Sequence, residues 1–279
     1  MIFWLASYPK SGNTWVRTFI STYYLSTQNK FEFNLLKNIK QFPHEKFFKK
    51  KMNNINEAVE NWIDAQENIN KNNNNNITFL KTHSAIANIN GNPFTTNKQT
   101  IAAIYIIRDP RNVVTSMSNH YDMDFENTVN FMINKKKFLM NKKKLDSYGN
   151  FTFLNSWSEH YNSWIGNKQF KTLLIKYEDL QNNTIKTFEK IVLFINQISS
   201  KDQKINKDRI SQIIETISFE KLKDKEQKQG FPEAVINNRN KKTNFFHLGK
   251  QNNWEKILTP KQIDILNKVF YADLKYLKY

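Results

Sequence analysis

A segment near the start of the chain combines residue types that bind anions. The apolar run Ile2–Ala6 favours a buried strand, and an apolar helical pattern begins at Trp15. The turn between them consists of Lys10, Ser11, Gly12, Asn13 and Thr14. In a strand, turn and helix of this kind, free backbone N–H groups and the positive end of the helix dipole face one point. The segment is therefore predicted to bind a phosphate or a similar anion.

The individual side chains support this prediction. Gly12 would let the backbone approach a ligand closely, Lys10 would add a mobile positive charge, and the hydroxyl and amide groups of the turn would add donors. The segment is not a Walker loop, in which a glycine and four residues precede Gly-Lys-Ser/Thr. Here Lys10 precedes Gly12 and no glycine stands upstream. The alternative interpretation is an ordinary strand-to-helix turn with a solvated lysine.

A histidine follows the next predicted strand. The run Ile77–Lys81 reads as a buried strand, with Thr82 and His83 just past its end. Ligands of α/β proteins bind at the carboxyl ends of the strands, and a neutral imidazole can accept a proton near neutral pH. A lone histidine is more often a packed or surface residue, so His83 is a candidate general base that depends on its surroundings.

An arginine follows the most apolar predicted strand, Ile101–Ile107. Arg108 can hold a phosphate with two parallel hydrogen bonds. Pro110 suits the first turn of a helix, and Ser116 then lies about two turns into that helix, where its hydroxyl could donate to the same anion. The alternative is a helix N-terminus with a solvated arginine.

The composition limits the classes of function. The chain has 279 residues, no cysteine, and 42 basic against 25 acidic side chains, which gives a formal charge of +17. Disulfide frameworks and thiolate chemistry are excluded, and anionic partners are favoured. No metal site is evident. No signal-peptide pattern precedes the first strand and no apolar run could span a bilayer, so a cytoplasmic protein is expected.

Strands alternate with helices along the chain, which predicts one α/β domain over residues 1–279 with a parallel sheet between helices. Phe170–Ile175 is the fourth predicted strand. Three helical predictions are tested below: single helices over Ile55–Ile69, Phe125–Lys144 and Pro260–Leu274. Two further expectations are a cap at Thr184 and a mobile loop over Lys223–Lys242. The lysine triplets at 135–137 and 142–144 are read as a solvated face.

Three of these segments resemble one family, the sulfotransferases that use 3′-phosphoadenylyl sulfate (PAPS). YPKSGNTW, residues 8–15, resembles their 5′-phosphosulfate loop, whose usual form is YPKSGTTW. Lys81-Thr82-His83 is similar to the Lys-Thr-His of the cytosolic members. RDPRNVVTS, residues 108–116, resembles their 3′-phosphate motif, with the arginine and serine at the same spacing.

Two later segments extend the resemblance. Tyr177-Glu178-Asp179 is similar to the family's Tyr-Glu-Asp, and Phe219 stands in the context of a phenylalanine that stacks on adenine. His247, Leu248, Gly249 and Lys250 lie where the family has Arg-Lys-Gly, so only the glycine is kept. Asn252-Asn253 replaces the Gly-Asp that follows, and the family's dimer motif is not matched, so the oligomeric state stays open.

The resemblance implies a fold similar to that of P-loop NTPases and sulfuryl transfer from PAPS to a hydroxyl or amine. It implies that His83 deprotonates the acceptor, that Lys10 and Lys81 supply positive charge, and that residues 10–15 bind the 5′-phosphosulfate. Arg108, Ser116 and the segment His247–Lys250 would bind the 3′-phosphate, while Trp15, Tyr177 and Phe219 would hold the adenine.

The acceptor would be a small molecule or a glycan. Its pocket is expected to be built from residues 31–51, 84–97 and 119–144 and from the mobile loop over 223–242. A P-loop-type ATP-dependent kinase and a basic nucleic-acid-binding protein are the alternatives.

Overall fold

Every residue of the first strand is buried, and this strand lies at the centre of a five-stranded sheet. The order is β2-β3-β1-β6-β9, and every pair is parallel. The computed structural model describes residues 1–74, 76–140, 147–200, 204–231, 233–236 and 242–279. The predicted parallel α/β sheet is confirmed: β3 and β9 are displaced by one residue from the predicted strands, and β1 and β6 are one residue longer.

The strands of the sheet are β1 Ile2–Ser7, β2 Lys40–Gln41, β3 Thr78–Thr82, β6 Thr100–Ile107 and β9 Lys171–Lys176. Three short antiparallel pairs lie outside it: β4 Asn88–Ile89 with β5 Asn92–Pro93, β7 Phe138–Leu139 with β8 Thr152–Phe153, and β10 Val235–Ile236 with β11 Lys242–Thr243.

The helices of the first half are α1 Asn13–Leu25, α2 Ile55–Glu60, α3 Trp62–Asn72, α4 Pro110–Tyr121 and α5 Phe125–Ile133. Those of the second half are α6 Trp157–Ile165, α7 Tyr177–Asn182, α8 Thr184–Ile198, α9 Lys207–Thr216, α10 Phe219–Gln229, α11 Trp254–Ile257, α12 Pro260–Val269 and α13 Tyr271–Leu277. Short 3-10 turns are η1 Phe33–Asn38, η2 Glu45–Phe47, η4 Tyr148–Asn150 and η5 Gly249–Gln251.

Successive side chains of the inner strands enter two different cores. In β1, Ile2, Trp4 and Ala6 enter one cluster, whereas Phe3 and Leu5 enter the other. This follows from the two-residue period of a strand. Because both faces are covered, the inner strands are continuously apolar, which is why their sequences were recognisable.

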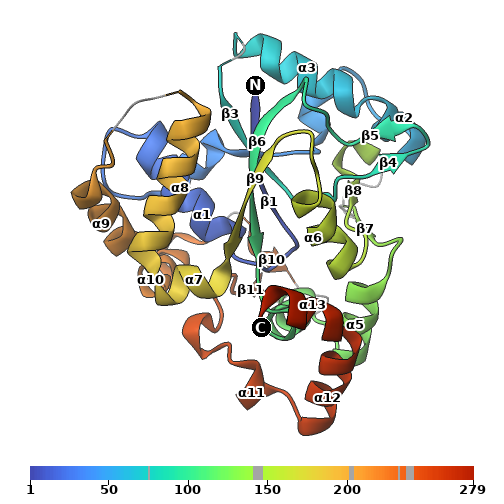
Figure 1. Cartoon of the computed structure of the whole chain (residues 1–279), viewed down its shortest axis with the longest axis vertical. Helices are drawn as coiled ribbons and strands as arrows, with labels where there is room; N and C mark the ends of the chain where they lie inside the picture. The colour runs from blue at the N-terminus through green and yellow to red at the C-terminus, as the bar shows by residue number, and fades with distance from the viewer. Residues whose placement is uncertain (75, 141–146, 201–203, 232, 237–241) are drawn as a thin grey trace.

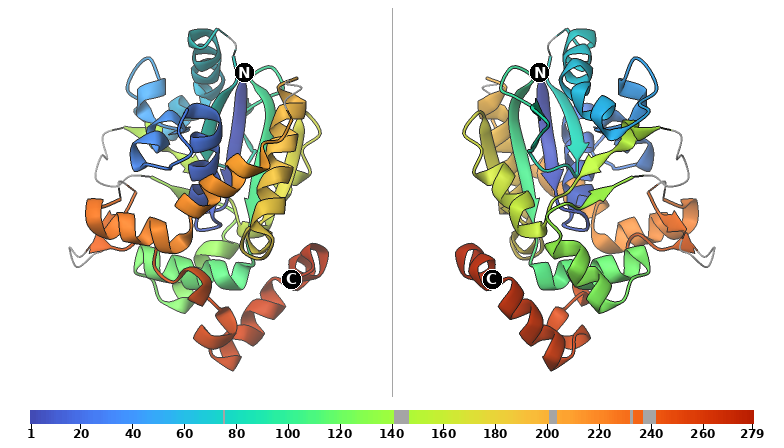
Figure 2. Two further views of the ribbon diagram at one scale, coloured as in Figure 1. Left: turned by 90° about the vertical axis from the view of Figure 1, so that its left-hand side faces the viewer. Right: turned by 90° about the vertical axis from the view of Figure 1, so that its right-hand side faces the viewer.

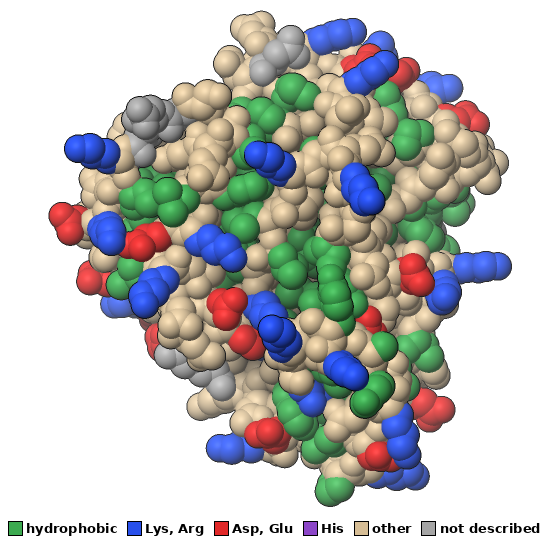
Figure 3. Space-filling model, in the orientation of Figure 1, with side chains coloured by type: hydrophobic (Ala, Val, Ile, Leu, Met, Phe, Trp, Pro, Cys, Tyr) green, Lys and Arg blue, Asp and Glu red, His purple; other side chains and the backbone are tan. Residues whose placement is uncertain are grey.

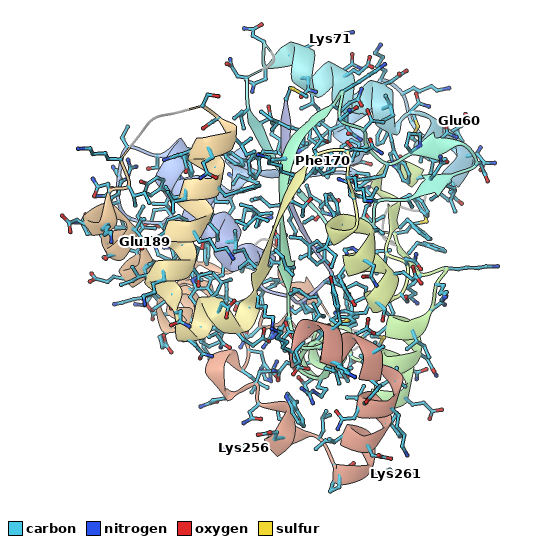
Figure 4. All side chains as sticks on the ribbon, in the orientation of Figure 1. Glu60, Lys71, Phe170, Glu189, Lys256 and Lys261 are labelled. Atoms are coloured by element: carbon cyan, nitrogen blue, oxygen red, sulfur yellow. The ribbon has the colours of Figure 1, made fainter. Side chains whose placement is uncertain are left out.

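Helices cover both faces of the sheet. In Figure 1, α1, α8, α9 and α10 lie to one side of the strands, and α5 and α6 lie to the other. Figure 4 labels Phe170, which is buried just before β9, while Lys71 and Lys256 lie at the periphery of the molecule. The two turned views show α12 and α13 projecting from the body below the carboxyl ends of the strands (Figure 2).

The topology creates a crevice at the carboxyl edge. The chain leaves β1 toward β2 and β3 and then crosses to the opposite side of β1 for β6 and β9. The loops that follow the neighbouring strands β1 and β6 therefore run to opposite sides of the sheet. Open α/β sheets bind ligands in the crevice between such loops. The predicted anion turn, His83, Arg108 and Tyr177 each directly follow one of these strands.

The prediction of a helix over Phe125–Lys144 is wrong over residues 134–140, whereas residues 141–144 lie outside the described part of the chain. The Asn134 side chain accepts a hydrogen bond from the Lys136 backbone at 2.8 Å, a local turn that competes with helix continuation. β7 follows and pairs with β8. Lys135 is exposed and pairs with Glu159, whereas residues 142–144 lie outside the described part of the chain.

The predicted loop over Lys223–Lys242 is wrong at its start, because α10 continues to Gln229. The Ser218 side chain caps this helix by accepting from Lys221. Leu222 and Glu226, one turn apart, are its buried residues. A helix that buries only two side chains and is otherwise mostly charged shows only a weak helical periodicity of apolar residues. Residues 237–241 lie outside the described part.

Three smaller predictions also need correction. The helix over 55–69 is two helices that meet at Asn61, and the helix over 260–274 is interrupted at Phe270. Thr184 does not cap α8: Asn183 holds the cap position without a side-chain bond, and the Thr184 hydroxyl donates to the Leu180 carbonyl instead. Among the described residues, no helix has the length and apolar character needed to cross a membrane.

Substitution at the centre of the sheet tests the two-sided core. Ile104 is fully buried in β6, so Ile104→Ala should lower the free energy of unfolding by about 3 kcal/mol, through lost transfer energy and a residual cavity. The matched control Leu193→Ala removes an aliphatic side chain that is 47% exposed on α8 and should cost under about 0.5 kcal/mol. Urea denaturation measures both, and equal losses would contradict the described core.

Candidate functional site

A cavity of about 820 Å³ lies at the carboxyl edge of the sheet. It is lined by residues that follow four different strands, including Lys10, His83, Arg108 and Tyr177. Residues of α4, α10 and the segment 245–252 complete its walls. The topology therefore brings the separately predicted motifs into one space.

The turn after β1 has the backbone that the sequence suggested. Lys10 and Gly12 both have positive φ, 67° and 97°, and Gly12 is the N-cap of α1. The Tyr177 ring packs against Gly12 so closely that a Cβ there would lie 2.4 Å from its Cδ2 atom. Only glycine fits this contact with this backbone. The turn thus lies directly against an aromatic ring.

Several buried polar atoms of this region have no partner within the described protein. Those that can donate a hydrogen bond include Ser11 Oγ, Trp15 Nε1 and Arg108 Nε. Buried polar groups are usually hydrogen-bonded, so these donors are candidates for hydrogen bonds to a ligand. Thr14 also lines the cavity. These groups are donors, or can act as donors, and fit an anionic ligand with several acceptor oxygens.

Asn13 differs from its expected role as a donor to the anion. Its amide nitrogen donates to the Leu5 carbonyl at 2.9 Å and to Ser7 Oγ at 3.3 Å. The side chain therefore ties α1 to β1 and shapes the turn from within. A sequence pattern cannot distinguish this use of an amide from ligand binding.

Arg108 lies next to the turn. Its Nη1 donates to the Lys10 carbonyl at 3.2 Å, and its guanidinium carbon lies 4.2 Å from the centre of the Tyr177 ring. These contacts place the guanidinium against an aromatic ring, and Nε is buried without a partner in the described protein. Ser116, from the second turn of α4, lines the same cavity.

The Tyr-Glu-Asp segment anchors this arrangement. Glu178 accepts from the Asp109 backbone N–H at 3.0 Å and from the Tyr279 hydroxyl at 3.0 Å. The carboxylate thus joins the end of β9 to the end of β6 and to the C-terminal residue. Burial raises the pKa of Glu178, and these hydrogen bonds oppose that rise.

His83 has a defined tautomer. Its Nδ1 lies 2.7 Å from the Ser7 carbonyl oxygen, which can only accept, so Nδ1 carries the proton. In the neutral ring Nε2 is then the free acceptor. Burial, followed by the nearby Lys81 charge, lowers the pKa of His83 well below its usual value. The imidazole is therefore neutral and can accept a proton at Nε2.

A second histidine supports His83. His160 Nε2 lies 3.0 Å from the His83 carbonyl oxygen, and its Nδ1 lies 2.7 Å from the Tyr105 hydroxyl. Both His160 and Tyr105 are fully buried. The backbone of His83 is thus fixed from the core face of β6 and α6, which limits movement of the imidazole.

The lysines of the site are sheltered from water. Burial, together with the Arg108 and Lys81 charges, lowers the pKa of Lys10 to about 7, and its ammonium lies 4.1 Å over the Phe245 ring. Lys81 is buried, and its ammonium donates to Glu233 at 3.2 Å. Glu233 also pairs with Arg17. The site therefore gathers several cations on largely buried side chains.

Residues 245–252, called the late segment below, form the wall of the cavity near Phe219. Gly249 has φ of 54°, and a Cβ there would lie 2.4 Å from the Phe219 ring. His247 is exposed, and both His247 and Leu248 line the cavity. Lys250 belongs to η5, and its side chain lies outside the described part of the chain.

Asn252 and Asn253, which replace the family's Gly-Asp, both form hydrogen bonds within the protein. Asn252 accepts from Thr115 Oγ1 at 2.6 Å and donates to the Asn112 carbonyl at 3.1 Å. Asn253 caps α11 by accepting from Glu255. The departure from the family pattern thus docks the late segment on α4.

The cavity lining also contains side chains from three of the ranges expected for the acceptor. Gln41, His44 and Glu45 come from 31–51, while Asn119–Tyr121, Leu139 and Met140 come from 119–144. Glu233 comes from the predicted loop over 223–242. The expectation for 84–97 is wrong for this cavity, since none of its lining residues comes from there.

Three charged or titratable residues of this region were not singled out from the sequence, although His120 and Glu233 lie in ranges expected to build the pocket: Arg17, His120 and Glu233. Arg17 follows the anion turn by one helical turn, where helical spacing from Asn13 is the only local signal. His120 is buried on α4, and its Nδ1 has no partner in the described protein. Glu233 is one acidic side chain in a basic segment, so its partner could not be inferred.

No group of three or more His, Asp or Glu side chains able to hold a metal ion occurs within the described ranges. Charge is also not concentrated on the face in Figure 3, where Lys and Arg side chains are spread among Asp and Glu. This face therefore does not show the clustered Lys and Arg side chains that mark a nucleic-acid interface.

Curated relatives of this chain are sulfotransferases of animals and plants. Sulfotransferase 2A1 of Macaca fascicularis is 26% identical over 174 residues, covering 60% of this chain and 54% of that protein. Luciferin sulfotransferase of Photinus pyralis is 24% identical and covers 78% and 56%. Flavonol 3-sulfotransferase of Flaveria bidentis is 24% identical and covers 95% and 79%. The chain thus spans little more than half the length of the first two proteins.

Solved structures share the fold. Mouse sulfotransferase SULT7A1 complexed with PAP has a TM-score of 0.56 at 19% identity, covering 98% of this chain and 84% of that one. Retinol dehydratase in complex with androsterone and PAP has a TM-score of 0.57 at 17% identity, covering 98% and 80%. The predicted sulfotransferase fold is confirmed.

The sulfotransferase domain family matches residues 2–278, which is nearly the whole chain. The anion turn, the imidazole and the guanidinium that first suggested this family meet in one cavity of the same fold. The chain belongs to the sulfotransferase domain family.

Proposed function

We propose that this protein, as one domain over residues 1–279, transfers a sulfuryl group from PAPS to a hydroxyl or amine of a small-molecule or glycan acceptor. The observation that carries the proposal is the meeting of a donor-rich anion turn, a cationic cluster and a neutral imidazole in one cavity. The PAP-containing structural neighbours support the choice of nucleotide.

The nucleotide would be held at both ends. Residues 10–15 would bind the 5′-phosphosulfate through backbone N–H groups, Ser11, Thr14 and Lys10. Arg108, Ser116 and the backbone of residues 247–249 would bind the 3′-phosphate, with Lys250 nearby in sequence. Trp15, Tyr177 and Phe219, which all line the cavity, would enclose the adenine. The orphaned donors of Ser11, Trp15 and Arg108 fit this assignment.

His83 would act as the general base. Its Nε2 would accept the proton of the acceptor while Nδ1–H stays bonded to the Ser7 carbonyl. PAPS, when bound, supplies the sulfuryl group, whose bond to a 5′-phosphate oxygen breaks as its bond to the acceptor forms. Lys10 and Lys81 would stabilise the charge that develops on the phosphate oxygen.

The acceptor would occupy the end of the cavity near His83. Asn119, His120 and Tyr121 face it from α4, with Leu139 and Met140 beside them. Polar groups with an apolar strip favour an acceptor that combines hydrogen-bonding groups with an apolar part. Labelled PAPS, incubated with a panel of phenols, sugars and amines, tests the proposal; absence of both transfer and PAP binding would overturn it.

Replacement of the imidazole tests the base. His83→Ala should lower kcat by about 10²–10⁴-fold, because the acceptor proton then has no positioned acceptor. The affinity for PAP, the 3′,5′-bisphosphate product, should stay within about threefold, since the nucleotide contacts are elsewhere. Calorimetry with PAP serves as the folding control. Turnover at the wild-type rate would remove His83 from the mechanism.

A pair of nucleotides tests Arg108. Arg108→Ala should weaken PAP binding by about 10- to 100-fold, the effect of losing hydrogen bonds to a charged group of about 1.5–3 kcal/mol. Binding of 5′-AMP, which lacks the 3′-phosphate, should change far less. Arg209→Ala on α9, whose guanidinium donates to the Ser26 carbonyl outside the site, is the control. Equal losses for both nucleotides would contradict the assignment.

The charge of Lys10 predicts a pH dependence. With a pKa of about 7 in the free protein, Lys10 loses its proton as the pH rises, so PAP affinity should fall between pH 7.5 and 9. The phosphates of PAP are already fully ionised there and do not offset the loss. Calorimetry across this range should show a smaller decline for Lys10→Met; an identical decline would assign the titration to another group.

A further inference from the structure

A carboxylate lies inside the cationic cluster of the site. Glu233 follows α10 and pairs through one oxygen with Arg17 of α1 and through the other with Lys81 of β3, at 3.2 Å. The side chains of Arg17 and Lys81 are 3% and 8% exposed, whereas that of Glu233 is 31% exposed. One acidic side chain thus bridges two buried cations from different elements.

This ion triad differs from a surface salt bridge. Buried charges without partners are strongly unfavourable, so removal of the carboxylate would leave two adjacent buried cations. The Nε atom of Arg17 is already buried without a partner in the described protein. The pairing of one carboxylate oxygen with Arg17 leaves the second oxygen at the Lys81 ammonium.

Lys81 is two residues before His83 and lines the same cavity. The charged and titratable groups that act on it come from every surrounding element: Lys10 from the anion turn, Arg17 from α1, His83 after β3, His120 from α4 and Glu233. Among these, only Glu233 carries negative charge. It is therefore the group that keeps the Lys81 ammonium directed and charged among cations.

We infer that Glu233 is a positioning residue for sulfuryl transfer, acting through Lys81. The inference rests on the proposed function. Glu233 holds the ammonium at the edge of the cavity, and Arg17 in turn holds Glu233. As the sulfur–oxygen bond to the 5′-phosphate breaks, its electron pair stays on the phosphate oxygen, and a protonated Lys81 stabilises that charge. A neutral lysine would not.

Burial lowers the pKa of Lys81, and the Glu233 charge opposes this effect. Without the carboxylate, Lys81 would lose its proton at lower pH than in the wild type. The pKa of Lys10 would move in the same direction, because Glu233 also raises it. The test must therefore separate these two lysines.

Glu233→Gln keeps the shape of the side chain and removes its charge. We expect kcat to fall by about tenfold or more at pH 8, against the 10²–10³-fold typical of a lost transition-state donor. The alkaline limb of the kcat profile should move to lower pH. PAP affinity should change by less than about threefold, since removal of the negative charge favours an anion while the lowered pKa of Lys10 opposes that gain. Asp224→Asn removes the same charge from α10, where Asp224 pairs with Lys228 at the surface, and should change neither quantity.

A double-mutant cycle assigns the effect to Lys81. In a Lys81→Met background, Glu233→Gln should change kcat by less than about twofold, because the group through which Glu233 acts is absent. If the effect of Glu233→Gln is as large in that background, or if kcat and its pH profile are unchanged in the single variant, the inference is overturned. A parallel loss of PAP affinity with an unmoved alkaline limb would also overturn it, because that pattern indicates only a structural role.

These outcomes are separate from failure of the proposed function. A wild-type protein that neither binds PAP nor transfers the sulfuryl group of PAPS would overturn that function whatever Glu233 does. Glu233→Asp retains the charge and should recover part of kcat and the wild-type alkaline limb. PAP binding by each variant shows that the site is folded.

Discussion

The site depends on positive charge carried by largely buried side chains. Lys10, Lys81 and Arg108 line the cavity at the carboxyl edge of the sheet, and Arg17 is joined to Lys81 through Glu233. Burial makes each charge costly unless a partner compensates it. The protein supplies only part of that compensation, through Glu233 and the aromatic faces of Tyr177 and Phe245. The donors of Ser11, Trp15 and Arg108 that have no partner in the described protein would suit an anionic ligand with acceptor oxygens.

The same environment has opposite consequences for a lysine and a histidine. Desolvation and neighbouring cations favour neutral His83, which is the state that a general base needs. The same effects oppose a protonated Lys81, which is the state that charge stabilisation needs. The Glu233 carboxylate pairs with Lys81, whereas the His83 imidazole is bonded to the Ser7 carbonyl, and this difference resolves the conflict. Lys81 can thus be protonated while His83, two residues later, is neutral.

The departures from the family's sequence pattern are concentrated in the late segment. His247 and Leu248 line the cavity where arginine and lysine are usual, so a 3′-phosphate would depend more on Arg108 and on backbone donors. Asn252 docks this segment on α4 through Thr115 and Asn112. The retained Gly249 lies against the Phe219 ring and admits no side chain. The aromatic wall is therefore kept although the basic residues are not.

The sequence by itself determined the inner strands, the anion turn and the residues that follow β3 and β6, because these depend on local patterns: continuous apolar runs, a glycine at an N-cap, and short motifs at strand ends. The ends of α5 and α10 were missed, since an Asx turn and a two-residue buried stripe leave weak periodic signals. Only the tertiary structure decided which groups meet. Glu233 lies 152 residues after Lys81 and 216 after Arg17, and no local pattern encodes a pairing over such separations.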